Sequence, residues 1–124
     1  KNPYFYADWT LEAAQLYIDM DAEFQTLLRT LPVRSEAIPD VLTYYESYDA
    51  ASLAHKLRTI PAFQGILSPM KEVEGGFLPD FHSRYFTEDF PFGMRFIIEL
   101  AQEKGVQIPK MKEVYEWGIR KAEY

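Results

Sequence analysis

The sequence predicts an all-α fold of about five to six helices. Apolar residues recur at spacings of three and four over several stretches, and no stretch alternates convincingly between apolar and polar residues. Proline and glycine separate these stretches where helices are expected to begin and end. The chain has 124 residues, of which 48% are hydrophobic and 16% aromatic. We therefore expect residues 1–124 to form a single domain around one core.

The first predicted helix runs from Thr10 to about Leu31. Threonine is a favoured N-cap, because its hydroxyl accepts a hydrogen bond from a backbone N–H that is otherwise free in the first turn. The apolar residues of this stretch fall mostly on one stripe, which consists of Leu11, Ala14, Ile18, Phe24, Leu28 and Leu31. One face of this helix should therefore pack against the core.

Two shorter helices are expected next. Residues 39–45 begin with proline, which is well tolerated at the first helical position. Asp49 is the predicted N-cap of a helix over residues 50–58. Its inner face is marked by Leu53 and Leu57. This helix should stop at Ile60, because the residue before a proline is disfavoured in the α region.

Residues 62–83 are predicted to be a long irregular connection, since turn-forming residues recur in it at Gly65, Pro69, Gly75, Gly76 and Pro79. Connections of this length are usually functional or mobile. The helix that follows should end at Lys104, with Gly105 as its left-handed stop. Its predicted apolar stripe is Phe92, Phe96, Ile97, Leu100 and Ala101.

A last helix is predicted from Pro109 to about Ala122, carrying Met111, Val114, Tyr115 and Trp117.

The start of the preceding helix, which ends at Lys104, has two interpretations. Either Thr87 caps it, or it begins at Pro91 with residues 87–89 as a preceding turn.

The composition narrows the functional classes. The formal net charge is -6 and the basic residues are scattered, which argues against nucleic acid as the main partner. Without cysteine, disulfides and thiolate metal sites are excluded. No apolar run approaches the roughly 20 residues that span a bilayer, and no signal peptide is visible. We expect a cytoplasmic protein with no metal and no membrane partner.

The common catalytic and cofactor motifs are missing. G-x-G-x-x-G, the phosphate-binding G-x-x-x-x-G-K-[ST], G-x-S-x-G and H-E-x-x-H do not occur. No residue of this chain is therefore assigned to cofactor binding. Of the two histidines, His55 is expected in the middle of a helix as an ordinary residue. His82 adjoins Ser83 and Arg84 and could line a site, although a single loop histidine is more often solvated than catalytic.

The strongest candidate site is the segment 84–93, Arg-Tyr-Phe-Thr-Glu-Asp-Phe-Pro-Phe-Gly. It holds two acids and an arginine among four aromatic residues. Rings exclude water, so a charge held against them interacts more strongly than it does in solvent. The segment can be the wall of a site or a well-packed helix start, and the residues alone favour the helix start.

Two residues of this segment have plausible chemical roles. With either helix start, Asp89 lies at a positive helix end, which keeps its carboxylate ionised. An ionised aspartate can orient a histidine imidazole and stabilise its protonated form. Arg84 could hold a carboxylate with two hydrogen bonds. Chemistry alone still favours a purely structural role for both.

The segment 84–93 resembles the signature of the octopine/nopaline (opine) dehydrogenase family, in the C-terminal α-helical domain of that family. Residues 5–10 and 105–109 are similar to the entry and the closing turn of this domain. The resemblance covers nearly the whole chain, although only the central motif is specific. The architecture is shared with the helical domain of 6-phosphogluconate dehydrogenase-like enzymes.

This resemblance implies a two-domain enzyme in which an N-terminal Rossmann domain binds NAD or NADP and the helical domain shapes the substrate side of the cleft. The implied reaction is the reductive condensation of an amino acid with a 2-oxo acid. In the family a His–Asp pair is the acid and base. Carried over, Asp89 is the aspartate of that pair and Arg84 contacts the substrate carboxylate, while Thr87 and Glu88 hold the turn. Neither His55 nor His82 occupies the place of the family's histidine.

A chain that begins with Lys1 and lacks both this histidine and a dinucleotide motif looks like a helical domain without its Rossmann partner. We expect it to be inactive alone. Two alternatives stay open. One is a helical interaction or dimerisation module with no enzymatic role, and the other is a two-domain reductase that acts on a 2-oxo acid without an amine. The aromatic residues would also permit a homodimer.

Overall fold

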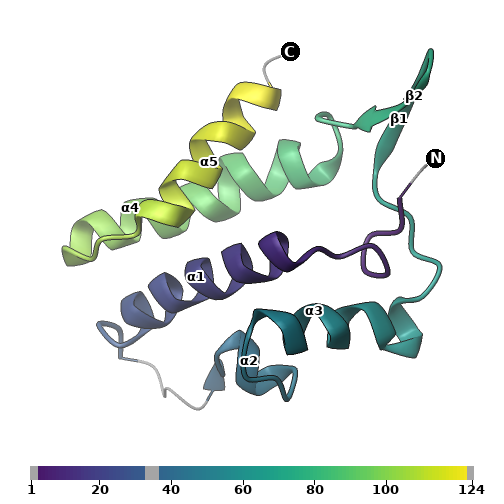
Figure 1. The fold of residues 1–124 in the computed structure, drawn as a ribbon. Coiled ribbons are helices and arrows are strands. Elements are labelled where there is room, and N and C mark those ends of the chain that lie inside the picture. Colours follow the sequence, from purple (N-terminus) through teal and green to yellow (C-terminus); the bar gives the residue numbers. More distant parts are fainter. Residues whose placement is uncertain (1–2, 33–36, 123–124) are drawn as a thin grey trace. The chain divides into compact units, whose positions relative to one another are not determined.

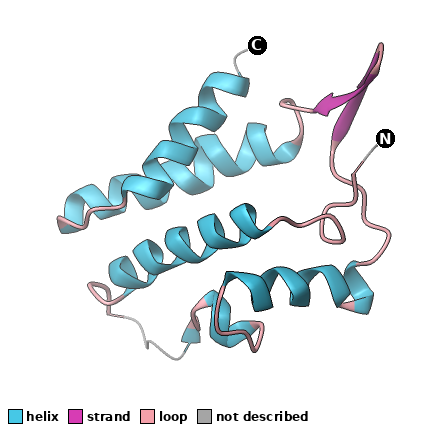
Figure 2. Cartoon of the chain, in the orientation of Figure 1, coloured by secondary structure: helices cyan, strands magenta, loops and turns pink. Residues whose placement is uncertain are grey.

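The structure, a computed structural model, describes residues 3–32 and 37–122. Helices dominate it, and a small antiparallel hairpin is added to them (Figures 1 and 2). The α-helices of the described residues are α1 (Leu11–Leu28), α2 (Val41–Tyr44), α3 (Ala50–Thr59), α4 (Arg95–Lys104) and α5 (Pro109–Ala122). The hairpin consists of β1 (Met70–Val73) and β2 (Gly76–Pro79). The all-α prediction is confirmed.

The chain divides into two compact units, and α1 contributes to both. The first unit comprises the chain up to Ile18 together with Pro39–Asp80. The second comprises Asp19–Ile38 together with the chain from Phe81 onward. Each unit has its own cluster of buried apolar residues. The single domain expected over residues 1–124 stays a prediction.

Helix capping in the first unit follows the sequence signals. Thr10 Oγ1 accepts a hydrogen bond from the Ala13 N–H at 3.1 Å, as expected of an N-cap. Asp49 caps α3 by accepting from the Ser52 N–H at 2.8 Å, and Ser52 Oγ accepts from the Asp49 N–H at 3.1 Å. The hydrogen bond from the Ser52 backbone lowers the pKa of the Asp49 carboxyl. Ile60 ends α3 in an extended conformation, as the following proline predicts.

The core of the first unit lies where α1 and α3 present their apolar faces. Its buried residues are Ala14, Val41, Ala50, Leu53, Ala54 and Leu57. The prediction for Leu53 and Leu57 is confirmed, since both are fully buried. The prediction for Leu11 is wrong, because its side chain is 52% exposed in the first turn of α1.

The boundaries of two predicted helices need correction. α1 ends at Leu28, and beyond it the N–H groups of Thr30 and Leu31 bond to carbonyls three residues back. The second helix begins at Val41 with Asp40 as its N-cap, so the proline at position 39 lies outside it. Asp40 carries no side-chain bond to the helix backbone, but its Oδ1 accepts from the Thr43 hydroxyl.

The hairpin lies inside the stretch that the sequence predicts to be irregular. Its register pairs Met70 with Pro79 and Val73 with Gly76, so Glu74 and Gly75 form the turn. Gly75 has a φ of 89°, a conformation that glycine adopts without steric cost. Both strands are short and neither alternates between buried and exposed residues, so they give no period-two signal.

The second unit contains α4 and α5, which lie side by side (Figure 1), and the C-terminal part of α1. Gly105 ends α4 with a φ of 69°, and α5 begins at Pro109, both as predicted. The buried residues of its core are Leu27, Ile98, Ala101, Ile108 and Met111. The carboxylate of Glu23 in α1 accepts hydrogen bonds from the N–H groups of Lys110 and Met111, at 2.7 and 2.8 Å.

The helix before Gly105 begins earlier than either predicted start. Residues Tyr85–Met94 form a π-helix that continues directly into α4, so neither Thr87 nor Pro91 is a helix start. Its predicted stripe is also partly wrong. Phe92 and Phe96 are 71% and 66% exposed, whereas Ala101 is buried as predicted and Ile97 and Leu100 pack against the core. Ile98, which the predicted stripe omits, is also buried.

Candidate functional site

The candidate segment folds as a ten-residue π-helix, Tyr85–Met94, with Pro91 inside it. Proline has no N–H to donate, and in an α-helix its ring clashes with the carbonyl four residues earlier. A π-helix has a wider turn with hydrogen bonds between residues five apart, and the Arg95 N–H bonds to the Phe90 carbonyl in this way. π-helical turns are rare in proteins overall, and those that occur are often found at functional sites.

The π-helix changes which residues share a face. In an α-helix, residues five apart point about 140° away from each other. Bonding between residues five apart instead stacks them on neighbouring turns of the same face. Arg84 adopts a helical conformation immediately before Tyr85, so Arg84 and Asp89 have this relation. The two candidate residues therefore lie on one side of the π-helix, and both are exposed.

Arg84 is already paired with an acid of its own helix. Its Nε and Nη2 donate hydrogen bonds to Oε2 of Glu88, at 3.1 and 2.9 Å. The side chains of this pair are 86% and 52% exposed, so solvent screens their attraction. The hydrogen bond and charge of Glu88, and to a smaller extent the charge of Asp89, raise the pKa of Arg84. The guanidinium is thus bound to Glu88 and also experiences the charge of Asp89.

Asp89 does not lie at the start of a helix, where the sequence predicts it. Because the helix begins at Tyr85, Asp89 lies within it and not at its positive end. The helix dipole acts mainly in the first turn, so it does not account for the charge of this residue.

The opposite side of the π-helix is anchored by aromatic rings. Phe86 and Phe90 stack with their centroids 5.2 Å apart and their planes within 6°. The Phe81 ring meets the Phe86 ring edge-on, with their centroids 5.0 Å apart. The centroid of the Trp117 ring of α5 lies 5.8 Å from that of Phe86. These four rings, Phe81, Phe86, Phe90 and Trp117, form an aromatic cluster that attaches the π-helix to α5.

Two residues that the sequence analysis did not single out, Gly118 and Ser83, also lie in this part of the second unit. Gly118 is buried in the middle of α5 directly beneath the Phe90 ring. An isolated glycine inside a helical pattern was a usable signal, because it costs about 1 kcal/mol relative to alanine and usually has a packing reason. Ser83 Oγ is also buried and makes no hydrogen bond within the described residues.

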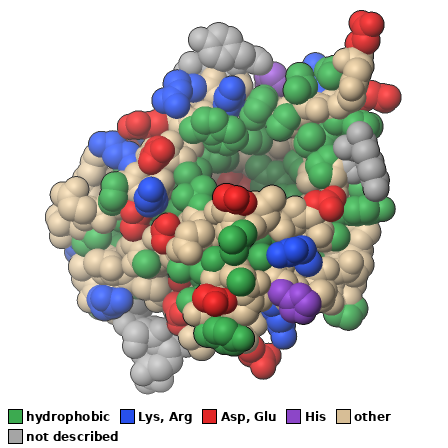
Figure 3. All heavy atoms as spheres, in the orientation of Figure 1, with side chains coloured by type: hydrophobic (Ala, Val, Ile, Leu, Met, Phe, Trp, Pro, Cys, Tyr) green, Lys and Arg blue, Asp and Glu red, His purple; other side chains and the backbone are tan. Residues whose placement is uncertain are grey.

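Both histidines are exposed. His82 is exposed in the turn before the π-helix, and His55 is exposed on α3. Among the residues that the structure describes, no group of three or more His, Cys, Asp or Glu could hold a metal ion. On the face drawn in Figure 3, Lys and Arg side chains are scattered among Asp and Glu. None of the described helices is long and apolar enough to cross a bilayer.

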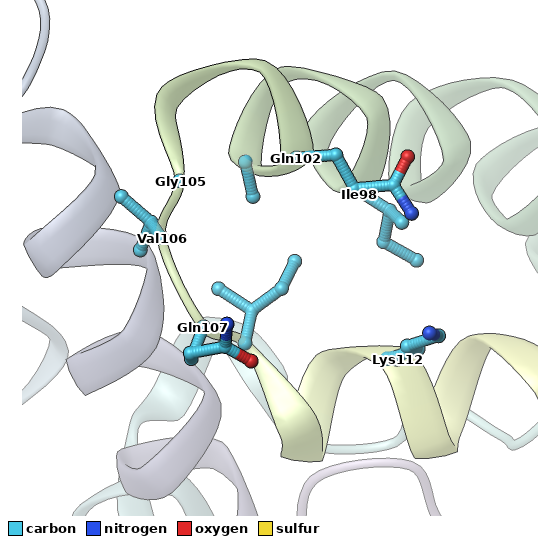
Figure 4. Close-up of a pocket in the computed structure, with 8 residues that line it drawn as sticks. Ile98, Gln102, Gly105, Val106, Gln107 and Lys112 are labelled. Carbon is cyan, nitrogen blue, oxygen red and sulfur yellow. The ribbon is translucent and has the colours of Figure 1, made fainter.

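A pocket of about 320 Å³ lies elsewhere in the second unit, where α4 turns into α5 (Figure 4). Its polar lining comes from Gln102, Gln107 and Lys112, and Ile98 and Val106 contribute apolar surface. Neither candidate residue of the π-helix lines it. This pocket is therefore separate from the candidate site.

Comparison with known proteins assigns the chain to a family. The model of the family described as NAD/NADP octopine/nopaline dehydrogenase, alpha-helical domain, matches residues 1–120. The chain is 33% identical over 129 aligned positions to an opine dehydrogenase of Haliotis discus hannai, covering 94% of this chain and 32% of that protein. It is 34% identical over 90 residues to octopine dehydrogenase of Pecten maximus, covering 68% of this chain and 23% of that protein.

Solved structures show the same relationship. Octopine dehydrogenase in complex with NADH and agmatine matches with a TM-score of 0.87 and 28% identity, over 99% of this chain and 33% of that one. Octopine dehydrogenase with NADH and pyruvate matches with a TM-score of 0.84 over 98% of this chain. The chain spans about a third or less of the length of these relatives. It belongs to the octopine/nopaline dehydrogenase family, in which it matches the α-helical domain.

Proposed function

We propose that this chain is the substrate-side domain of an opine-type dehydrogenase, which condenses an amino acid with a 2-oxo acid reductively at the expense of NADH or NADPH. The observation that carries the proposal is the family match over residues 1–120, which includes the whole π-helix. The π-helix supports it further by bringing Arg84 and Asp89 to one exposed face. An exposed ionic face of this kind is suited to a substrate bound between this domain and another.

Arg84 is proposed to hold the carboxylate of the 2-oxo acid. A guanidinium offers a planar fork of donors that matches both oxygens of a carboxylate. Its present partner, the carboxylate of Glu88, occupies this fork through Nε and Nη2. The pair is solvent-exposed and therefore weak, so a substrate carboxylate can replace Glu88 at low cost.

Asp89 is proposed to orient and charge-stabilise a histidine contributed by another part of the enzyme. A carboxylate that accepts a hydrogen bond from one imidazole nitrogen fixes which tautomer is present and stabilises the imidazolium. That histidine could then hold or release a proton at the other nitrogen, next to the reacting carbon.

We propose that the dinucleotide is bound mainly outside this chain. No glycine-rich phosphate loop occurs in the sequence. The first N–H groups of α5, which could receive a phosphate, are occupied by the Glu23 carboxylate, and the cap of α3 is occupied by Asp49. When bound, the dinucleotide supplies a hydride. We propose that another domain of the enzyme binds it and that this chain alone is inactive.

The proposal is tested by the substrate requirement of the protein made from the full reading frame that contains this chain. NADH or NADPH should be consumed when pyruvate or another 2-oxo acid is combined with an amino acid. The 124-residue chain alone should consume neither. Equal consumption without any amine would replace the proposed reaction with simple reduction of a 2-oxo acid. No consumption in any combination would remove the enzymatic proposal.

The role of Arg84 is tested by Arg84→Gln, which removes the charged fork. The KM for the 2-oxo acid should rise by about 10- to 100-fold, because a hydrogen bond to a charged group is lost. Steady-state kinetics measure this, and the KM for the dinucleotide should be unaffected. Arg95→Gln is the matched control, since Arg95 forms an exposed pair with Glu99, also four residues away, at 3.0 Å in α4. Equal effects of the two substitutions would contradict the assignment.

A further inference from the structure

Gly118 leaves room for a ring of the π-helix. A Cβ atom at this position would lie 2.7 Å from Cγ of Phe90 and nearer still to Cδ1 and Cε1 of the same ring. Real Cβ atoms essentially never approach other heavy atoms closer than 3.0 Å. Phe90 can therefore occupy its observed place only because residue 118 of α5 has no side chain.

The Phe90 ring has little freedom to retreat from such a contact. It stacks on Phe86, and Phe86 is itself in contact with Phe81 and with Trp117 of α5. Protein interiors are close-packed, so a displaced ring moves its neighbours or the backbone that carries it. The same rings attach the π-helix to α5, so a displaced ring would shift the π-helix relative to α5.

The π-helix carries the candidate site residues immediately beside these anchored rings. Asp89 directly precedes Phe90, and Arg84 lies two residues before Phe86. A π-helix is a rare conformation, so surrounding packing has to maintain it. A movement of the rings on α5 should therefore reorient both ionic side chains on the opposite face.

We propose that Gly118 and Phe90 form a positioning pair, which fixes where Arg84 and Asp89 lie although neither member of the pair touches the substrate. This inference rests on the proposed function of the Arg84–Asp89 face. According to this proposal, α5 controls the geometry of substrate binding although none of its residues is proposed to contact the substrate.

The structural part of the proposal is tested in the 124-residue chain with Gly118→Ala. We expect the NMR signals of the Arg84 Nε–H and of the Trp117 indole N–H to shift while the helical content is retained. Gly93→Ala is the matched control, because it makes the same change in the π-helix and its Cβ would meet no atom within 4 Å. The control should leave the Trp117 signal in place. An unchanged Arg84 signal in Gly118→Ala would overturn the proposal.

A second variant keeps the test decisive if Gly118→Ala does not fold. Phe90→Leu removes the ring from the other side of the contact and should shift the same Arg84 signal. A double-mutant cycle then shows whether the two residues act as one unit. Adding Gly118→Ala to Phe90→Leu should have a much smaller effect than in the wild type. An undiminished effect would mean that Gly118 does not act through Phe90.

The functional part is tested by kinetics on the full reading frame. Gly118→Ala should raise the KM for the 2-oxo acid and lower kcat, by tenfold or more together, because misplacement by about 1 Å can cost on the order of 100-fold. The KM for the dinucleotide should not change. A loss of thermal stability with wild-type KM and kcat would show that the pair is only structural. A wild-type protein without dehydrogenase activity would refute the proposed function, and the Arg84 signal would still decide whether the pair positions this residue.

Discussion

Glu23 lies in α1 and accepts hydrogen bonds from the backbone N–H groups of Lys110 and Met111 at the start of α5. The first N–H groups of a helix have no partner within the helix, and a carboxylate is the favoured acceptor at this positive end. α5 begins with proline, which contributes no N–H, so Glu23 binds the next two donors. One side chain thus joins segments 87 residues apart within the second unit.

Replacing Glu23 with alanine should lower the free energy of unfolding by about 1–3 kcal/mol, because two N–H groups lose their charged acceptor. Urea denaturation followed by circular dichroism measures this change. Glu103→Ala is the control, since Glu103 is an exposed glutamate on α4. If the two variants lost equal stability, the cap would contribute nothing specific.

The helices were predictable to the extent that their signals are local. Thr10, Asp49, Gly105 and Pro109 mark helix ends through the chemistry of one residue and its near neighbours, and the structure confirms all four. The contact of Glu23 with α5 was not predictable, because no local pattern connects residues so distant in the chain. The hairpin was missed since its four-residue strands do not alternate in burial.

The π-helix was the largest departure from the predicted elements. Apolar spacing was interpreted with the period of an α-helix, which assigned Phe92 and Phe96 to the core. The π-helix before Arg95 changes the phase of Phe92 relative to α4, and that ring is exposed. Phe96 lies in α4 itself and is exposed, while Ile98 of the same helix is buried. Pro91 signalled a disturbed helix, but the sequence did not show that the disturbance is a wider turn.

Leu57 and Leu11 of the first unit differ in burial, so their replacement should have different effects on stability. Leu57→Ala should cost about 2–5 kcal/mol of stability, because it leaves a cavity in a fully buried site of α3. Leu11→Ala should cost much less, since the side chain is half exposed in the first turn of α1. Chemical denaturation of both variants measures the difference. If both variants lost similar stability, the observed difference in burial would be contradicted. The predicted apolar stripe, in which Leu11 faces the core, would then be supported.

At the scale of the whole molecule, we propose that this chain supplies one part of an active site. The sequence motif identified Arg84 and Asp89 through a family resemblance, and the family match confirms that resemblance. Sequence alone could not show that the two residues share a face, because residues five apart diverge in an ordinary α-helix. Their exposure also fits a site that is completed by another domain.

We propose above all that Asp89 belongs to the catalytic machinery of the complete enzyme. The most direct measurement is kcat for Asp89→Asn in the protein made from the full reading frame, with Glu99→Gln as a control on the neighbouring exposed pair of α4. We predict that kcat falls by about 100- to 10,000-fold, because proton transfer by the histidine loses its orienting charge. The KM for the dinucleotide should stay as in the wild type. A kcat for Asp89→Asn within about twofold of both wild type and control would contradict the claim.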